Sequence, residues 1–371
     1  MPSTFSFPTT TIFEIGARRE LRGWLAKLGS VRPLVVTDAS LTKTNAFALL
    51  MASLDEKRAA VFSNVRPNPD EADVEAALRA YRESDCDAVI AFGGGSALDV
   101  GKAVRLRLKR PDKTLAQFNF DADWSGLAPL IAIPTTAGTG SEVGRSAVII
   151  MEHRKRVIFH PSLLANLVIL DPEFTRDLPP KLTAATGADA LTHCIESFTS
   201  PLFHPLCDGI ALEGIHLIAV ALPRAVRDGG DLEARGLMQV AAAMGGIAFQ
   251  KDLGAAHSLA HPLSSLCGLH HGLANALCLP FVMDFNAARK PGVYRRVGIA
   301  LGLSEPTDAD TIAAVRALLA EIGITLGLRA HGVDESKLDA LADQAFADSC
   351  HPTNPVPVTR EDLRKLYECA L

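Results

Sequence analysis

The first half of the chain alternates short apolar runs with stretches of helical periodicity. The runs are rich in branched residues and lie at 33–37, 87–92, 130–133 and 167–170. Nearly continuous apolar strands are typical of a sheet that is buried on both faces. Between the runs, Val74, Leu78 and Tyr81 recur at helical spacing within 69–84. The alternation predicts an α/β fold with a doubly wound parallel sheet.

From residue 180 onward the dominant pattern is that of long helices rich in alanine and leucine, and few strand signals remain. The clearest helices are predicted over 205–222, 231–249, 271–288 and 308–322. The pair Pro179–Pro180 punctuates the chain where the pattern changes. We therefore expect an α/β domain over 1–178 and a C-terminal all-α domain over 179–371.

Composition excludes several classes of protein. The chain has 371 residues with 48% apolar and 21% charged residues, which suits two globular domains. Its 37 Lys and Arg against 42 Asp and Glu leave a formal charge of −5, so neither a nucleic-acid nor a membrane partner is expected. The run 210–222 contains Glu213 and His216 and is predicted to be too short and too polar to cross a bilayer.

Cysteine usage and the N-terminus bear on the cellular compartment. The seven cysteines include no C-x-x-C pair, which argues against a disulfide framework and for a reducing compartment. The N-terminal residues show no basic segment followed by an apolar one, so a signal peptide is not indicated. Together these features predict a cytoplasmic protein.

A glycine loop follows the strand predicted at 87–92. Three glycines, Gly93, Gly94 and Gly95, precede a helix that we expect over 100–108. Glycines let a phosphate approach the backbone N–H groups, and the N-terminus of a helix favours an anion. Ser96 is the predicted N-cap, with Asp99 three residues later as in a capping box. The spacing differs from G-x-G-x-x-G, and a tight turn without a ligand is the alternative.

A second polar loop follows the strand at 130–133 and contains Thr135, Thr136 and Thr139. Ligands of open α/β sheets lie beyond the carboxyl ends of the strands, so the two loops together favour a nucleotide site. Asp38 ends another predicted strand. A carboxylate there would accept hydrogen bonds from an adenosine ribose and repel a 2′-phosphate. A helix cap or a solvated turn is the alternative for Asp38.

Two pairs of side chains have the spacing i, i+4, namely Asp189 with His193 and His257 with His261. On a helix this spacing puts both side chains on one face, with Cβ atoms about 5–6 Å apart. A carboxylate and three imidazoles suit a divalent metal such as Fe²⁺ or Zn²⁺. The candidate ligands are Asp189, His193, His257 and either His270 or His271. A lone histidine on an apolar helix is more often a core residue, but two pairs near a third element favour a metal site.

These motifs resemble the iron-containing (group III) alcohol dehydrogenase family over nearly the whole chain. The resemblance rests on the segments 93–102, 134–142, 185–196, 260–263 and 271–275. It implies a two-domain enzyme whose α/β domain binds NAD(P) and whose helical domain binds a catalytic divalent metal. It also implies an oligomer, which we expect to be a homodimer.

Position by position, the resemblance implies the metal ligands Asp189, His193, His257 and His271. His271 is preferred to His270 because the motif continues through Gly272–Asn275. The resemblance places His261 near the reacting centre, outside the ligand set. It implies cofactor contacts at Asp38, Asn68, Gly94, Gly95, Ser96, Thr135, Thr136, Thr139, Val148 and Lys155, with Asp38 as an NAD-favouring residue. The segment 249–254 is one residue shorter than the usual pattern, which would reshape the substrate pocket.

The expected reaction is reversible hydride transfer between NAD(H) and a small alcohol or aldehyde, with the metal as a Lewis acid. His261 would pass the proton or, alternatively, prop a neighbouring ligand. Two other functions stay open. A metal-independent reductase of an oxo-acid, similar to maleylacetate reductases, would keep the cofactor loops, and Arg145 would then pair with a substrate carboxylate. A non-catalytic protein would bind the nucleotide without turning over an aldehyde.

Overall fold

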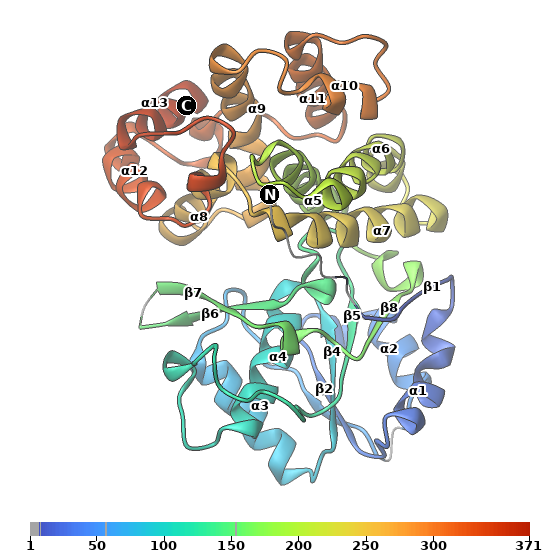
Figure 1. Cartoon of the computed structure of the whole chain (residues 1–371). Helices are drawn as coiled ribbons and strands as arrows, with labels where there is room; N and C mark the ends of the chain where they lie inside the picture. The colour runs from blue at the N-terminus through green and yellow to red at the C-terminus, as the bar shows by residue number, and fades with distance from the viewer. Residues whose placement is uncertain (1–6, 8, 56–57, 153) are drawn as a thin grey trace. The chain divides into compact units, whose positions relative to one another are not determined.

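The computed structural model describes residues 7, 9–55, 58–152 and 154–371 (Figure 1). By their internal contacts these residues divide into two compact units. The first, which we call the α/β unit, consists of Phe7–Thr136 and Gly140–Leu178. The second, the helical unit, consists of Ala137–Thr139 and Pro179–Leu371. Thr139 therefore belongs to the helical unit, although Thr135 and Thr136 belong to the α/β unit.

The α/β unit is built on a six-stranded sheet in the order β1-β8-β5-β4-β2-β3. All neighbouring strands in it run parallel, which confirms the predicted fold class. The strands are β1 (Thr11–Phe13), β2 (Pro33–Val36), β3 (Ala60–Phe62), β4 (Ala88–Gly93), β5 (Leu130–Pro134) and β8 (Leu167–Leu170). The sequence pattern does not predict β1 and β3, because a three-residue strand leaves too short an apolar run to recognise.

Helices cover both faces of this sheet. They are α1 (Leu21–Lys27), α2 (Asn45–Ala52), α3 (Glu71–Glu83) and α4 (Gly95–Lys109). Figure 1 shows α1 and α2 on one face and α3 and α4 on the other. Ile90 and Phe92 of β4 share an apolar core with α1 and α2. On the opposite face α4 packs so closely on β4 that a Cβ added to Gly101 would lie 2.7 Å from the Cβ of Ala91.

The start of α4 differs from the prediction. The helix begins at Gly95 with Gly94 as its N-cap, and Ser96 lies inside its first turn. The predicted cap at Ser96 is therefore wrong. Asp99 instead accepts hydrogen bonds from Ser141 Oγ at 2.7 Å and from the Val148 N–H at 3.1 Å. Its carboxylate ties α4 to the loop after β5 rather than capping its own helix.

A separate antiparallel hairpin joins β6 (Ser146–Met151) to β7 (Arg154–Phe159). Alternate residues of β6 are buried, as expected of a strand with one face on the protein. The sequence pattern does not predict the hairpin, because Lys155 and Arg156 break the apolar run. Val148 pairs with Val157 in this hairpin. The hairpin thus carries two of the implied cofactor contacts, Val148 and Lys155.

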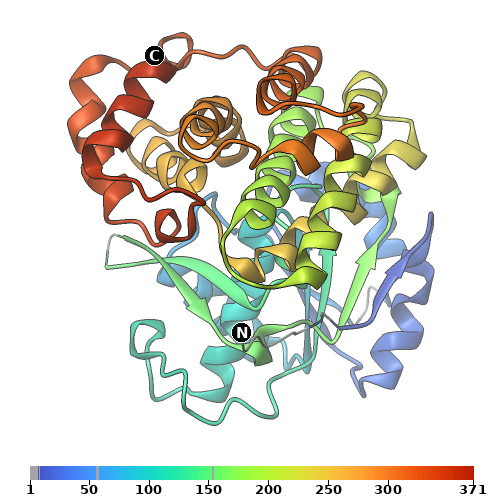
Figure 2. The same ribbon diagram turned by 45° about the horizontal axis from the view of Figure 1, so that its top comes forward.

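The helical unit is built from α-helices that share an apolar core. Its α-helices are α5 (Pro180–Thr199), α6 (Pro205–Arg227), α7 (Leu232–Ala248), α8 (Ala255–Cys267), α9 (His271–Arg289), α10 (Arg295–Ala300), α11 (Asp308–Glu321), α12 (Leu338–Phe346) and α13 (Arg360–Ala370). The predicted helices at 205, 231, 271 and 308 correspond to α6, α7, α9 and α11. The last two helices, coloured red, pack side by side in both views (Figures 1 and 2).

α6 is longer than the apolar run from which it was predicted, because it continues through Pro223 to Arg227. Of the helices in the described part of the chain, it alone is long and apolar enough to cross a membrane by length and composition. The prediction that this segment is too short and too polar to cross a bilayer is therefore wrong on both counts. Ile215, Ile218 and Leu222 of α6 are nevertheless completely buried, and the helix packs against α5 and α7. Such a buried face is typical of a core helix.

Candidate metal centre

One face of α5 carries three ionisable side chains. Asp189, His193 and Glu196 have the spacing i, i+4, i+7, which aligns them along one stripe of the helix. All three are buried, with exposed fractions of 2%, 5% and 4%. Polar groups this deep need partners, so the surroundings of this stripe indicate its chemistry.

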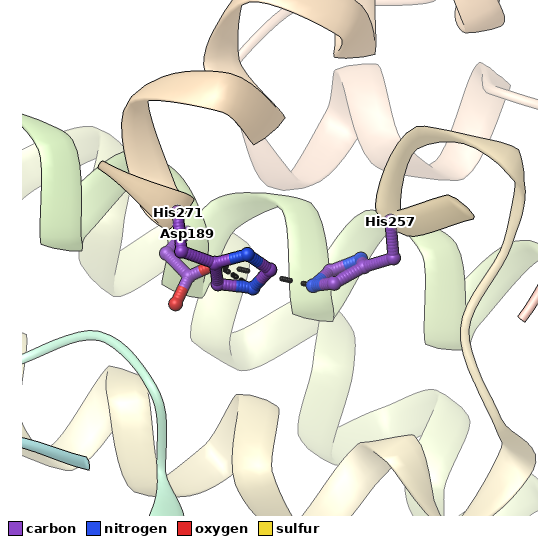
Figure 3. A group of neighbouring side chains, drawn as sticks. All are labelled: Asp189, His257 and His271. Atoms are coloured by element: carbon purple, nitrogen blue, oxygen red, sulfur yellow. Dashed lines mark ion pairs between the residues drawn. The ribbon is translucent and has the colours of Figure 1, made fainter. Parts of the chain in front are cut away.

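Asp189 meets two histidines that come from other helices. The possible ligand atoms of Asp189, His257 and His271 all lie within 4.8 Å of one another. Asp189 Oδ1 is 3.8 Å from His257 Nε2 and 3.5 Å from His271 Nε2. Figure 3 shows the two rings, from α8 and α9, directed toward the carboxylate. Three of the four predicted ligands thus converge, and His270 is not part of this group.

His193, the fourth predicted ligand, lies beside the group rather than within it. Its ring stacks on that of His257, with the centroids 4.7 Å apart. Burial lowers the pKa of His193 to about 4, so its imidazole is neutral at pH 7. A neutral imidazole is the form that binds a metal.

The group contains the donor atoms that a cation requires. Neither His193 Nδ1 nor His257 Nε2 has a hydrogen-bond partner among the residues that the structure describes. Burial alone would raise the pKa of Asp189, but the neighbouring histidines lower it to about 2, so the carboxylate is ionised. Buried nitrogens without partners are costly unless a ligand satisfies them. The group therefore fits a divalent metal with nitrogen and oxygen ligands.

Two further residues hold the ligands in place, and neither was singled out from the sequence. Asn275 donates from Nδ2 to Asp189 Oδ1 at 2.8 Å. Glu196 Oε2 lies 2.6 Å from His257 Nδ1. The helical spacing in the sequence could have identified both residues, since Asn275 is four residues after His271 and Glu196 is seven residues after Asp189.

His261 lies one helical turn beyond His257 on α8. Its Nδ1 is 2.8 Å from Asp348 Oδ2, and its ring stacks on that of His271 with centroids 5.2 Å apart. Asp348 also accepts a hydrogen bond from Ser258 Oγ at 2.8 Å. Burial alone would raise the pKa of Asp348, but the hydrogen bond and charge of His261 hold it well below its usual value. No sequence spacing indicates Asp348, which lies 87 residues from His261.

The two predicted nucleotide loops begin at neighbouring strands of the α/β unit. They follow the adjacent parallel strands β4 and β5, in which Gly93 pairs with Pro134. The Thr135 N–H donates to the Gly93 carbonyl at 3.0 Å. The side chain of Thr136 lies 3.6 Å from the position that a Cβ on Gly94 would take. Bare backbone and small hydroxyl groups thus share the carboxyl edge of the sheet, where a phosphate can approach.

The other implied cofactor contacts have varied surroundings. The Asp38 carboxylate accepts hydrogen bonds from the Ser40 and Leu41 N–H groups at 2.9 and 3.0 Å, as in a capped turn. Asn68 is exposed and has a φ of 53°, in the left-handed region. Burial lowers the pKa of Lys155, and the charge of Asp99 opposes this shift.

The fold and these groups define a class, that of oxidoreductases that use a nucleotide and a divalent metal. Comparison with known proteins narrows this class. Residues 8–172 match the family model described as iron-containing alcohol dehydrogenase, and residues 183–371 match that of the C-terminal part of the same family. The chain therefore belongs to the iron-containing alcohol dehydrogenase family.

Individual relatives agree with this assignment. The 4-hydroxybutyrate dehydrogenase of Cupriavidus necator is 39% identical over 369 residues, which are 96% of each chain. The crystal structure of a 1,3-propanediol oxidoreductase superposes with a TM-score of 0.95 at 32% identity, over 100% of both chains. The crystal structure of sulfoacetaldehyde reductase from Bifidobacterium kashiwanohense, solved in complex with NAD⁺, superposes with a TM-score of 0.91. The two sequences are 30% identical, and the match covers 100% of this chain and 99% of that one.

The protein is an NAD-dependent alcohol dehydrogenase that uses NAD and a divalent metal. The family, the reaction type and the cofactors predicted from the sequence are thereby confirmed. The two alternatives, a metal-independent oxo-acid reductase and a non-catalytic nucleotide-binding protein, are not supported.

Proposed function

We propose that the enzyme interconverts a small alcohol and its aldehyde at a divalent metal held by Asp189, His193, His257 and His271. The observation that carries this proposal is the convergence of a buried, ionised carboxylate with two imidazoles, beside an unbonded nitrogen of His193. Nitrogen and carboxylate donors suit Fe²⁺ or Zn²⁺. When bound, such a metal polarises the aldehyde oxygen and lowers the pKa of the alcohol.

The ligand set favours this chemistry through its charge. Asp189 supplies a single negative charge, and the histidines are neutral ligands, so a divalent ion would keep a net positive charge. Asn275 holds the Asp189 carboxylate through a hydrogen bond, and both residues are buried. These residues thus bind the ion without quenching its attraction for a substrate oxygen.

We assign proton transfer to His261. Its side chain is 34% exposed, and its Nδ1 is held by Asp348, which leaves Nε2 to exchange a proton with substrate or water. Histidine is the side chain that most often serves as a general acid or base in enzymes. The alternative is that His261 props His271 through ring stacking.

We propose that the predicted domain over 1–178 binds NAD at Gly94, Gly95, Ser96, Thr135, Thr136 and Thr139, with further contacts from Asn68, Val148 and Lys155. The metal-binding domain is proposed to span residues 179–371. Asp38 follows a strand next to β4, and its carboxylate would repel the 2′-phosphate of NADP.

We further propose a cytoplasmic homodimer without nucleic-acid or membrane partners. All seven cysteines are free thiols, which suits a reducing compartment. The net charge of −5 offers no excess of basic groups for a polyanion. Light scattering after size exclusion measures the oligomeric state, and a mass equal to one chain would contradict the dimer.

Elemental analysis combined with a substrate panel tests the central proposal. The purified enzyme is assayed for iron and zinc, and NADH oxidation is followed with short aldehydes, ω-oxo-acids and 2-oxo-acids before and after chelation. We expect stoichiometric metal, turnover of at least one aldehyde, loss of activity on chelation and recovery when metal is restored. Full activity in a metal-free Asp189→Asn variant would contradict the proposal.

A further inference from the structure

Glu196 occupies a position that the ligand set does not explain. Its carboxylate is buried at the end of the α5 stripe, where it meets the first turn of α8. Oε2 accepts from the Gly254 N–H at 3.0 Å, and Oε1 accepts from the Ala256 N–H at 2.6 Å. Oε2 also lies 2.6 Å from His257 Nδ1. A buried carboxylate with this many donors is held in one orientation.

We propose that Glu196 is a positioning residue that orients His257, so that the Nε2 nitrogen of this histidine faces the metal. This inference rests on the metal site proposed above. It assigns to Glu196 a role outside the ligand set, exerted through the imidazole that it holds. A carboxylate behind a metal-bound histidine fixes the ring and its tautomer, and losing it typically weakens metal binding about 10–100-fold.

The hydrogen-bonding chemistry of the pair determines which nitrogen is available. An ionised carboxylate only accepts hydrogen bonds, so His257 Nδ1 must carry the proton that it shares with Glu196. In the neutral imidazole the lone pair then belongs to Nε2. Nε2 is the nitrogen that faces Asp189, and it has no hydrogen-bond partner among the described residues. Glu196 therefore keeps a proton on Nδ1 and turns Nε2 toward the side of the ring where the ion would bind.

The same carboxylate sets the position of the helix that carries His257. α8 has Gly254 as its N-cap, and this residue has no side chain with which to cap the helix. Glu196 takes over this function from α5, because it accepts hydrogen bonds from the Ala256 and His257 N–H groups of the first turn. A Cβ on Gly254 would lie 2.8 Å from Glu196 Oε1, so a larger residue at this position would displace the carboxylate. α5 and α8, which supply Asp189 and His257, are thus fixed in register by one side chain.

The test compares metal binding by the wild-type enzyme, Glu196→Gln and a control. Glutamine keeps the size of the side chain and one acceptor but loses the charge. Glu213→Gln is the matched control, since Glu213 is an exposed carboxylate on the neighbouring helix α6. Each protein is loaded with Co²⁺ or Zn²⁺, and metal transfer to a chromophoric chelator is followed. The visible spectrum of the Co²⁺ form reports the coordination geometry.

We expect Glu196→Gln to bind Zn²⁺ about 10–100-fold more weakly, with a changed Co²⁺ spectrum and unaltered NADH affinity. The control should match the wild type. Gly254→Ala, which keeps the charge but crowds the carboxylate, should weaken metal binding in the same direction and keeps the test decisive if Glu196→Gln does not fold. Wild-type affinity and spectrum in either folded variant would overturn the inference. A wild-type enzyme that binds no metal would instead contradict the proposed function.

Discussion

His261 and His257 lie on one helix, yet their surroundings assign them different tasks. The two residues are one turn apart, and each has Nδ1 next to a carboxylate. His257 is fully buried beside Asp189, whereas the side chain of His261 is 34% exposed. A buried nitrogen is shielded from solvent protons and suits an enclosed ion, whereas an exposed one can exchange protons with solvent.

Substitution of His261 separates proton transfer from support of a ligand. We expect His261→Ala to retain its metal and to lose about 10²–10⁴-fold in kcat for alcohol oxidation, because general acid–base catalysis contributes about that much. Metal content by mass spectrometry and steady-state kinetics measure the two effects. Loss of the metal together with the activity would mean that His261 props His271 instead.

Glu142 gives the α/β unit a pH-dependent stability. It is 2% exposed, and burial raises the pKa of its carboxyl to about 7, although the charge of Lys102 opposes the shift. The folded state therefore holds the proton more tightly than the unfolded chain does. Between about pH 4.5 and pH 7 the free energy of unfolding should decrease as the pH rises, by up to roughly 3 kcal/mol in total.

Glu142→Gln should abolish the decrease in the free energy of unfolding with rising pH. The variant should therefore be as stable as the wild type near pH 4.5 and more stable than it at pH 8. Urea unfolding followed by tryptophan fluorescence measures this free energy, because Trp24 and Trp124 both lie in the α/β unit. Glu83→Gln, at an exposed position in the same unit, is the control. Parallel pH profiles for all three proteins would contradict the prediction.

The sequence predicts contacts between residues that are close along a helix, but not contacts between residues that are far apart in the chain. The spacing i, i+4 identified Asp189, His193 and His257 because helical neighbours are close by geometry. Glu196 lies one turn further along the same helix face, so the same spacing argument could have identified it. This argument could not identify Asp348, because its contact with His261 arises only from the packing of distant segments.

At the scale of elements, the close approach of α9 to α5 positions the metal ligands. A Cβ on Gly272 would lie 2.1 Å from the Ala185 carbonyl oxygen and 3.0 Å from the Asp189 Cβ. Gly272 is next to His271, so the start of α9 can approach α5 only with glycine at this position. The two ligands Asp189 and His271 depend on this packing.

Gly272→Ala should therefore push α9 away from α5, reduce the metal content and lower the melting temperature. Gly209→Ala on α6 is the control, since a Cβ there meets no atom within 4 Å. Alanine in a helix is favoured over glycine by about 1 kcal/mol, so the control should be neutral or slightly stabilised. Thermal melting with metal analysis compares them, and equal behaviour of the two variants would contradict the role of this contact.

Secondary structure was predictable where an element carried enough residues of one pattern. The central strands β2, β4, β5 and β8 are buried on both faces and produce apolar runs that are easily recognised. The edge strands are three residues long, and β7 interleaves charged with apolar residues, so their pairing depends on neighbours rather than on their own pattern. The first turn of α4 was missed because glycines are poor helix formers.

At the scale of the whole molecule, the chemistry is divided between two compact units. The glycine loop after β4 and the residues Thr135 and Thr136 after β5 lie in the α/β unit, whereas Thr139 and the carboxylate–histidine group lie in the helical unit. Each unit has its own apolar core. Binding of the nucleotide and binding of the metal should therefore be separable in experiments, although turnover requires both.

Removal of the metal tests this separation. We expect the metal-free enzyme to bind NADH with its affinity unchanged within about two-fold but to lose turnover, because the residues proposed to hold the phosphates and ribose lie mainly in the α/β unit. Added Zn²⁺ should raise the melting temperature of the helical unit, since a ligand at about 100 times its Kd stabilises the native state by about 2.7 kcal/mol. Circular dichroism at 222 nm follows mainly the helices, and tryptophan fluorescence follows the α/β unit. A metal-free enzyme that no longer binds NADH would show that the two sites depend on each other.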